Sequence, residues 1–314
     1  MNIAVLGTGF GAYHAHLLKK LDGVDRVVVF GRNESKLQKL QEELHVEITK
    51  HMDEIIHDPT IDVVDICLPS QLHRQFAVEA LKNKKHVFCE TPVCYTLDDA
   101  QAMKHARDQS GKKLLVNQFI KFDPAYAYLR SAQTENKYGQ LLSLSLKRET
   151  APLWGDLGLS SITTNLMIHE LDFVTWLFGR NASMSAWGAE SSDKKQSIAY
   201  SHFHYPEAHA KIVASSQMPT SYPFTVGYEA YFEKAKLVFQ EAVSNDQTES
   251  FLCEYTSSGK HEFVLEPVNP YEKSLRHAIQ CFANHTQSII DVDHAVESLE
   301  LALGLQKQLA LQRQ

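Results

Sequence analysis

The 314-residue sequence predicts an α/β protein with two parts, a doubly wound parallel sheet followed by a mostly antiparallel sheet with one open face. Three observations lead to this prediction. Continuously apolar strands alternate with helical stretches from residue 2 to residue 117, which is typical of a parallel sheet covered on both faces. Several later segments alternate apolar and polar residues with a period of two, which indicates an antiparallel sheet with one covered face. The segment from Asn269 onward returns to helical periodicity.

The predicted strands of the first part are short and rich in valine, isoleucine and leucine. They cover residues 2–7, 26–30, 62–69, 85–90 and 113–117. The helical stretches between them cover residues 12–21, 34–44, 72–83 and 97–109. Ligands of such sheets bind outside the carboxyl ends of the strands, so the segments that follow the strands are the candidates for a binding site.

Composition argues against several classes of function. The net charge of −7 and the pI near 6.1 give no support for a nucleic-acid or membrane-surface partner. No apolar run approaches the roughly 20 residues that cross a bilayer, and a strand-like segment rather than a signal peptide follows Met1. The five cysteines are odd in number and form no Cys-x-x-Cys pair. Reduced thiols in a cytoplasmic protein are the simplest interpretation.

The segment "GTGFGA" follows the first strand and opens the first helix. It fits G-x-G-x-x-G/A, with Gly7 for a tight turn, Gly9 for close approach of a pyrophosphate and Ala12 as the small residue where helix meets strand. The helix N-terminus offers free N–H groups and a positive dipole end to the phosphates. This context favours dinucleotide binding over a purely structural glycine turn. The predicted contacts are Gly7, Thr8, Gly9, Phe10, Gly11 and Ala12.

The end of the second strand bears on which dinucleotide is bound. A carboxylate there usually holds the ribose 2′-hydroxyl of NAD, whereas an arginine accommodates the 2′-phosphate of NADP. Gly31 occupies the expected acidic position, Arg32 follows it, and Lys36 lies further along the helix. A solvated helix start with ordinary surface charge is the alternative. We predict that NADP(H) is favoured over NAD(H), because the acid is missing and a cation is present.

In the second part, "ITTNLMIHELDFVTWLFG" carries two opposite stripes at about 100° per residue. One stripe is apolar, and the other contains Asn165, His169, Asp172 and Trp176. The polar stripe could face solvent around a structural histidine, or it could line a cleft. Periodicity alone leaves both interpretations open.

Two further features of the second part have open interpretations. Trp154 and Asp156, in the loop "ETAPLWGDLGLSS", could contact a substrate or only pack and cap the loop. His202 and His204 share a strand face, but no nearby set of Asp, Glu or Cys completes a metal site. We therefore expect no metal ligands in this protein.

These segments together resemble the Gfo/Idh/MocA family of glucose–fructose oxidoreductases and inositol dehydrogenases. The resemblance rests on "GTGFGAYHA", "VDICLPSQLHRQFAVEALKNKKHVFCETPV", "FDP", "NLMIHELDFVTWLFG" and "NPYEKSLRHAIQ". It implies a Rossmann domain over residues 1–122 and an α/β domain with a large open sheet over residues 123–314. The C-terminal helices of the second domain could pack back on the first. A homodimer or homotetramer through the open sheet face is also implied.

The resemblance further implies an NAD(P)-dependent oxidoreductase. It would transfer hydride between nicotinamide and a sugar-, cyclitol- or polyol-like alcohol or ketone. A dinucleotide-binding regulator or scaffold without turnover is one alternative. A redox-assisted hydrolase or epimerase on the same fold is another.

Site residues carry over from the family position by position. Pro69 and His73 match the segment that borders the nicotinamide end of the cofactor. Glu90 and Pro92 match the outer members of the family's Glu-Lys-Pro motif. The resemblance implies that these four residues, with Arg32, belong to the cofactor site.

On the substrate side, His169 and Asp172 match the histidine and the following acid of the signature Asp-x-Gly-x-His-x-x-Asp. His169 is implied as the acid/base group. Asp172, Asn165 and Trp154 are the expected substrate contacts.

Two positions depart from the family pattern. Thr91 stands where the family has its lysine, and Asn165 stands where its first aspartate would be. Threonine can donate a hydrogen bond, so Thr91 stays a catalytic candidate, but it does not titrate near neutrality. His169 is then the leading proton carrier. The alternatives are Tyr95, Tyr126 and Tyr271.

Overall fold

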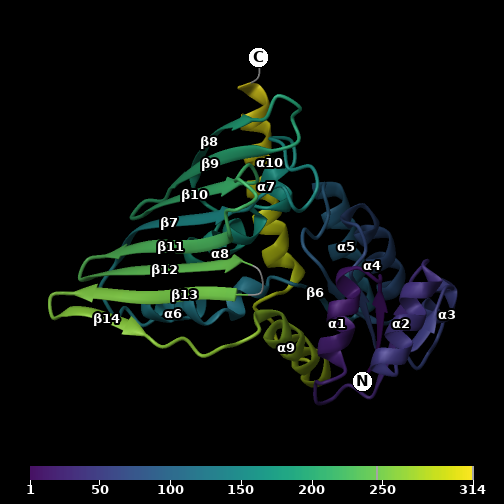
Figure 1. Cartoon of the computed structure of the whole chain (residues 1–314). Coiled ribbons are helices and arrows are strands. Elements are labelled where there is room, and N and C mark those ends of the chain that lie inside the picture. Colours follow the sequence, from purple (N-terminus) through teal and green to yellow (C-terminus); the bar gives the residue numbers. More distant parts are fainter. Residues whose placement is uncertain (245–246, 313–314) are drawn as a thin grey trace. The chain divides into compact units, whose positions relative to one another are not determined.

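The computed structural model describes residues 1–244 and 247–312. The chain divides into two compact units, each with its own sheet (Figure 1). The first unit comprises Met1–Phe119 and Asn269–Val296, and the second comprises Ile120–Val268 and the residues from Glu297 onward. The first unit thus ends at residue 119 rather than 122. It also includes a C-terminal segment that the sequence prediction placed within residues 123–314.

The first unit contains the predicted doubly wound sheet, six parallel strands in the order β3-β2-β1-β4-β5-β6. The strands are β1 (Asn2–Leu6), β2 (Arg26–Phe30), β3 (Glu47–Thr49), β4 (Val63–Ile66), β5 (His86–Cys89) and β6 (Leu114–Val116). The strand order reverses between the neighbours β1 and β4, where ligands of such sheets bind. Strand β3 was not predicted, because it has three residues and none of them is fully buried.

Side chains cap the start of some helices of the first unit. The helices of this unit are α1 (Phe10–Leu18), α2 (Glu34–Leu44), α3 (Met52–Ile56), α4 (His73–Lys82), α5 (Leu97–Ser110) and α9 (Pro270–Asn284). The side chain of Asn33 caps α2 by accepting the backbone N–H of Lys36, and Thr96 caps α5 through Asp99 in the same way.

Helix α9 belongs to the first unit because its apolar face packs there. Leu275, Ile279 and Phe282 are buried, and the ring of Phe282 lies 4.9 Å from that of His86 on β5. Periodicity predicted this helix, but it could not predict which unit would cover the apolar face.

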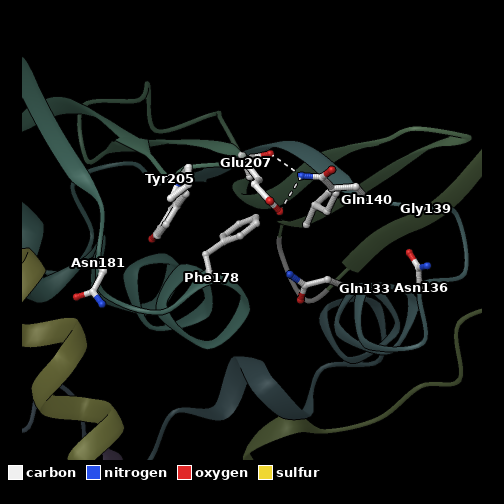
Figure 2. Close-up of a pocket in the computed structure, with 11 residues that line it drawn as sticks. Gln133, Asn136, Gly139, Gln140, Phe178, Asn181, Tyr205 and Glu207 are labelled. Carbon is white, nitrogen blue, oxygen red and sulfur yellow. Dashed lines mark hydrogen bonds between the residues drawn. The ribbon is translucent and has the colours of Figure 1, made fainter.

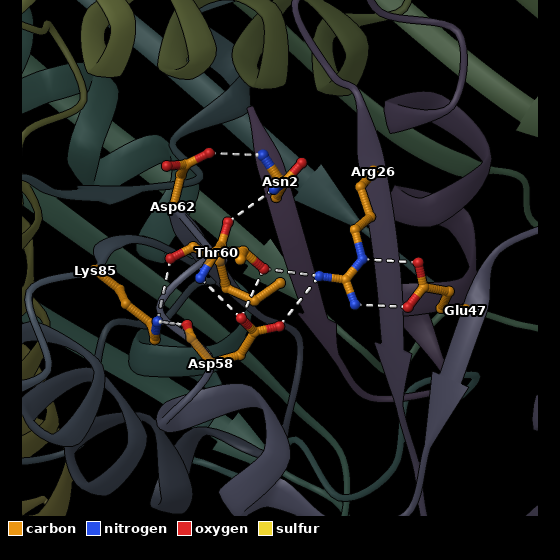
Figure 3. A network of polar contacts seen from close by, with 8 residues as sticks. Asn2, Arg26, Glu47, Asp58, Thr60, Asp62 and Lys85 are labelled. Atoms are coloured by element: carbon orange, nitrogen blue, oxygen red, sulfur yellow. Dashed lines mark hydrogen bonds and ion pairs between the residues drawn. The ribbon is translucent and has the colours of Figure 1, made fainter.

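A polar network joins the short edge strand β3 to the rest of the first sheet (Figure 3). The guanidinium of Arg26 donates to both carboxylate oxygens of Glu47, at 2.7 and 2.6 Å, and to Asp58 and Thr60 at 3.1 and 3.0 Å. Lys85 Nζ donates to the carbonyl oxygen of Ile61 at 3.1 Å. Arg26 is the first residue of β2, so the network lies at the amino ends of the strands, opposite the ligand-binding edge.

The second unit contains an eight-stranded sheet in the order β14-β13-β12-β11-β7-β10-β9-β8. The strands are β7 (Leu141–Glu149), β8 (Ser183–Glu190), β9 (Ser197–His204), β10 (His209–Ser215), β11 (Phe224–Phe232), β12 (Ala235–Ser244), β13 (Gln247–Thr256) and β14 (Gly259–Phe263). Only the β7–β10 pair is parallel, so the prediction of a mostly antiparallel sheet is confirmed.

Helices cover one face of this second sheet (Figure 1). They are α6 (Pro124–Thr134), α7 (Ile162–Asn165), α8 (Ile168–Phe178) and the later part of α10 (Val292–Leu311). Tyr126 of α6 lies in the core, 4.8 Å from Phe173 and 5.6 Å from Phe239 between ring centroids.

The stretch 162–179 forms two helices, α7 and α8, rather than one. Its polar stripe is not a solvent face, since Asp172 is buried.

The other face of the second sheet carries exposed aromatic side chains. They are Trp187, Tyr200, Tyr231, Phe251 and Tyr255. The ring of Trp187 stacks on that of Tyr200 at 5.6 Å and on that of His202 at 5.0 Å. This is the open face predicted from the period-two alternation. Within the described ranges, no helix combines the length and the hydropathy that crossing a membrane requires.

Candidate functional site

The loop between β1 and α1 has the geometry of a phosphate-binding turn. Gly7 has a φ of 120°, and a Cβ atom there would lie 2.6 Å from the carbonyl oxygen of Cys67. A Cβ atom at Gly9 would have no neighbour within 4 Å. Gly7 thus closes the turn while Gly9 leaves open space, as the G-x-G spacing predicts.

The helix meets the sheet at Gly11 rather than at Ala12. A Cβ atom at Gly11 would lie 3.0 Å from Cγ1 of Val5 and 3.3 Å from Cβ of Cys67. Ala12 is half-buried. The sequence prediction gave this packing role to Ala12, one position later. Because α1 begins at Phe10, Gly11 is the residue that turns toward β1.

A cavity of about 440 Å³ lies beside this loop, at the carboxyl ends of β1, β2 and β4. Its lining residues are Gly7, Thr8, Gly9, Phe30, Gly31, Arg32, Asn33, Lys36, Cys67, Leu68 and Pro69. Five predicted cofactor contacts belong to this lining: Gly7, Thr8, Gly9, Arg32 and Pro69. The volume and the open space at Gly9 fit part of a dinucleotide.

The cavity offers positive charge where NAD-specific proteins place an acid. A Cβ atom at Gly31 would lie 2.5 Å from Cγ2 of Thr8, so a side chain at the strand end would have to displace that of Thr8. Arg32 and Lys36 are exposed in the cavity wall. Asn33 Oδ1 accepts the hydroxyl of Ser35 at 2.8 Å while it caps α2. Two cations and a helix N-terminus therefore lie at the wall of this cavity.

Beneath the loop, the imidazole of His14 lies between two carboxylates. Its Nδ1 is 2.8 Å from Oδ2 of Asp65 and 3.3 Å from Sγ of Cys67, and its Nε2 is 3.0 Å from Oε1 of Glu90. Burial lowers the pKa of His14, but the neighbouring Asp65 and Cys67 more than offset this and raise the pKa well above its ordinary value. Sequence reasoning missed this cluster, because its members come from separate elements.

The Glu90-Thr91-Pro92 turn, whose Thr91–Pro92 peptide is cis, is held from inside the first unit. Glu90 accepts the side-chain amide of Asn117 at 2.6 Å and the backbone N–H of Thr91 at 3.2 Å. The ring nitrogens of His73 lie 3.0 Å from the carbonyl oxygen of Pro92 and 2.8 Å from that of Leu68. Glu90 and His73 thus have protein partners that brace the turn.

In the second unit, a buried lysine partners the predicted acid. Nζ of Lys121 lies 3.0 Å from Oδ1 of Asp172, and both side chains are almost fully buried. Burial lowers the pKa of Lys121, although Asp172 partly opposes this. Burial raises the pKa of Asp172 to about 6, although Lys121 partly opposes it. Lys121 was missed because it lies on the short 3₁₀ turn η2 (Phe119–Phe122), far from Asp172 in sequence.

His169 lies one turn before Asp172 on α8, and Asn165 ends α7. Burial, with a smaller contribution from the charge of Arg148, lowers the pKa of His169 well below its ordinary value, so the ring is neutral near pH 7. The Oδ1 atom of Asn165 is buried and accepts no hydrogen bond from any described residue. Buried acceptors of this kind call for a partner, which a ligand hydroxyl can supply.

The loop residue Trp154 connects to this helix through other side chains. The centroid of its ring lies 4.9 Å from that of the Phe224 ring. On the Phe224 ring also lies the guanidinium of Arg148, 5.5 Å from the ring centroid. Arg148 Nε in turn donates at 2.9 Å to Glu170, the neighbour of His169. Trp154 is 53% exposed, which leaves much of its ring free for contact.

The tyrosine alternatives are placed differently. Tyr126 is a core residue, and burial raises the pKa of its hydroxyl well above the ordinary value, which disfavours proton exchange near neutrality. Tyr271 lies in the first unit within an aromatic cluster, 5.3 Å from Phe10 and 4.1 Å from Phe119 between ring centroids. Tyr95 is half-buried.

A second cavity, of about 630 Å³, lies within the second unit (Figure 2). Its wall includes Gln133, Gln140, Phe178, Tyr205 and Glu207, and the Gln140 amide donates to the Glu207 carbonyl at 2.9 Å. No predicted site residue lines this cavity. We therefore assign it no part in the site.

The buried carboxyl of Asp172 predicts a pH-dependent stability. The native carboxyl takes up a proton below about pH 6, whereas an unfolded aspartate does so only below about pH 4. The native state therefore holds more protons between these values. The contribution of Asp172 to the free energy of unfolding should fall by on the order of 3 kcal/mol as the pH rises from 4 to 6. Urea titrations of wild type and Asp172→Asn would measure this difference, and parallel pH dependences would contradict it.

Comparison with known proteins supports the fold. Residues 1–118 match the GFO_IDH_MocA model, an oxidoreductase family with an NAD-binding Rossmann fold. This segment is thus similar to the NAD-binding domain of that family. The Gfo/Idh/MocA resemblance of the sequence is therefore supported in the first unit, where the phosphate-binding turn lies.

Curated relatives extend the Gfo/Idh/MocA likeness beyond that domain. The myo-inositol 2-dehydrogenase of Thermotoga maritima is 28% identical over 184 residues, which cover 57% of this chain and 55% of the relative. The chain spans about half the length of the curated relatives it matches. A similar match, at 26% identity, is to inositol 2-dehydrogenase of Salmonella typhimurium.

Solved structures show the same fold over the whole chain. UDP-N-acetylglucosamine 3-dehydrogenase GnnA from Acidithiobacillus ferrooxidans has a TM-score of 0.84 at 20% identity, covering 99% of this chain and 98% of the other. At these identities the likeness concerns the fold alone. It matches the predicted α/β class of both units.

Proposed function

We propose that this protein is an NADP(H)-dependent oxidoreductase acting on a sugar-, cyclitol- or polyol-like alcohol or ketone. The observation that carries the proposal is the cation-lined cavity beside a phosphate-binding turn, in a domain of an oxidoreductase family. When bound, the nicotinamide supplies the hydride chemistry. The first unit holds the cofactor, and the second carries the groups that orient a substrate and handle its proton.

Proton handling follows from the charge states in the second unit. Neutral His169 accepts a proton from a hydroxyl, which matches alcohol oxidation. Asp172 lies one turn after His169 on α8, and its partner Lys121 on η2 adds a titratable side chain that Thr91 does not provide. Asn165 Oδ1 supplies an acceptor for a second hydroxyl. The similarity to a myo-inositol 2-dehydrogenase favours a polyhydroxylated substrate.

A spectrophotometric panel tests the proposal. Sugars, inositols and their keto forms would be incubated with NADP⁺ or NADPH, and absorbance at about 340 nm would follow the cofactor. At least one substrate class is expected to turn over. Tight NADPH binding without any turnover would instead support the regulator or scaffold. Product formed without cofactor consumption would support the redox-assisted hydrolase or epimerase.

Replacement of Arg32 tests the cofactor preference. A charged hydrogen bond to a phosphate contributes about 1.5–3 kcal/mol, so Arg32→Ala should weaken NADPH binding roughly 10- to 100-fold and leave NADH binding nearly unchanged. Fluorescence titration would measure both dissociation constants. Lys39→Ala is the matched control, because Lys39 is an exposed cation on the neighbouring helix α2 that pairs at 3.7 Å with Glu43 and does not line the cavity. Tighter binding of NADH than NADPH by the wild type would overturn the preference. The structural relative KijD10, a 3-ketoreductase from Actinomadura kijaniata, was solved with NADP.

Replacement of Trp187 tests the predicted homodimer or homotetramer. The exposed aromatic face, with Trp187 stacked on Tyr200, is the surface that would be buried between copies. Trp187→Asp should shift the protein to a smaller species in light scattering, since a charge would enter an apolar interface. Leu311→Asp is the control, an exposed apolar residue on the end of α10. A wild type that is monomeric at high concentration would remove the basis for this proposal.

A further inference from the structure

Three donor atoms converge beneath the dinucleotide loop, in a cluster that the proposed hydride chemistry does not use. They are Nδ1 of His14 on α1, a carboxylate oxygen of Asp65 on β4, and Sγ of Cys67 just after β4. All three lie within 4.8 Å of one another, and His14 and Asp65 are buried. We propose that His14, Asp65 and Cys67 bind a divalent transition-metal ion of the zinc type, against the expectation from sequence that the protein has no metal ligands.

The spacing of the donors matches a tetrahedral site. With bonds of about 2.0–2.1 Å to nitrogen and oxygen and about 2.3 Å to sulfur, tetrahedral ligands lie roughly 3.3–3.6 Å apart. Sγ of Cys67 lies 3.3 Å from Nδ1 of His14 and 3.5 Å from Oδ1 of Asp65. The contact of His14 Nδ1 is to the other carboxylate oxygen, Oδ2, at 2.8 Å. Metal binding therefore requires the Asp65 carboxylate to turn one oxygen toward both other donors, with all three donor atoms already within 4.8 Å of one another.

The far side of the imidazole carries an independent feature of metal sites. Nε2 of His14 lies 3.0 Å from Oε1 of Glu90, and Glu90 is itself held by Asn117 at 2.6 Å. A ligating histidine nearly always donates its other ring N–H to a carboxylate, which fixes the ring and strengthens the metal bond. Glu90 lies at this distance without a hydrogen bond to Nε2, so a small rotation of the ring on metal binding has to complete this support, while Nδ1 faces the other two donors.

The donor set selects the class of ion. Calcium and magnesium prefer oxygen ligands only, whereas mixed nitrogen, oxygen and sulfur ligands suit zinc and its neighbours. On binding, Cys67 loses its thiol proton and His14 its Nδ1 proton, and both protons pass to water. The thiolate and the Asp65 carboxylate then balance the charge of the ion. Cys67 also lines the dinucleotide cavity, which gives the ion a route from solvent.

Cobalt(II) is the probe that reads out this site without any enzyme assay. The full chain, stripped with a chelator, is expected to bind one equivalent of cobalt(II). Intense visible bands and a thiolate-to-metal charge-transfer band should appear. Cys67→Ser should abolish the charge-transfer band and weaken binding by at least about 10-fold. Cys281→Ser is the matched control, since its Sγ also contacts a histidine, His277 at 3.4 Å, outside the cluster.

The outcomes separate a metal site from a hydrogen-bonded cluster. If Cys67→Ser does not fold, Asp65→Asn is measured in the same way, and it should also weaken cobalt binding. Zinc should raise the melting temperature of the wild type but not of a folded cluster variant. Absence of cobalt bands in the folded wild type, or an unchanged spectrum in the variants, would show that these side chains only bond to one another and would overturn the proposal.

Discussion

Replacing Lys121 with methionine is expected to lower the free energy of unfolding by about 3–5 kcal/mol. Methionine keeps the apolar stem and removes the charge, so the buried carboxylate of Asp172 loses its counterion 3.0 Å away. Breaking a buried pair from one side costs more than the pair contributes, because the remaining charge has no compensation. Urea denaturation of wild type and variant near pH 7 would measure the difference.

A double variant separates the charge effect from packing. The double variant Lys121→Met with Asp172→Leu removes both charges of this pair. Much of the stability lost in Lys121→Met should therefore return. Arg180→Ala is the surface control, because the ion pair of Arg180 with Glu300 has side chains that are 54% and 35% exposed. Loss of this ion pair should lower the free energy of unfolding by under about 1 kcal/mol. Equal losses for Lys121→Met and Arg180→Ala would mean that the buried pair has no special role.

Replacing His169 with glutamine is expected to lower turnover by about 10²- to 10⁴-fold, the usual contribution of a general acid or base. Glutamine keeps hydrogen-bonding capacity but cannot exchange a proton. The dissociation constant of NADPH should stay unchanged, since the cavity that would bind it belongs to the first unit. Steady-state kinetics with the substrate class found by the panel, and fluorescence titration of NADPH, would measure the two quantities.

The histidine prediction needs a control for general effects of substitution. His105→Gln changes an exposed histidine on α5 and should leave kcat and the melting temperature unchanged. If His169→Gln loses turnover together with stability, the ring is structural. Unchanged turnover would assign the proton to another group, with Lys121 the first to test.

The elements that the sequence predicted well share one property, which is that their pattern is local. The first unit's buried strands read as apolar runs, and caps such as Asn33 and Thr96 fix where helices begin. The turn at Gly7 follows from glycine spacing, because only glycine readily adopts its positive φ. Short or exposed elements such as β3 carry no such pattern.

The same distinction between local patterns and contacts between separate elements applies to the candidate site. The sequence by itself determined the doubly wound sheet, the phosphate-binding turn and the position of Arg32 after the second strand. Each of these follows from patterns among residues that are neighbours in the sequence. Only the tertiary structure paired Lys121 with Asp172 and gathered His14, Asp65, Cys67 and Glu90, since these contacts join separate elements. The physical reason is that periodicity specifies which face of an element is buried, whereas the partner of a buried charge depends on which elements the fold brings together.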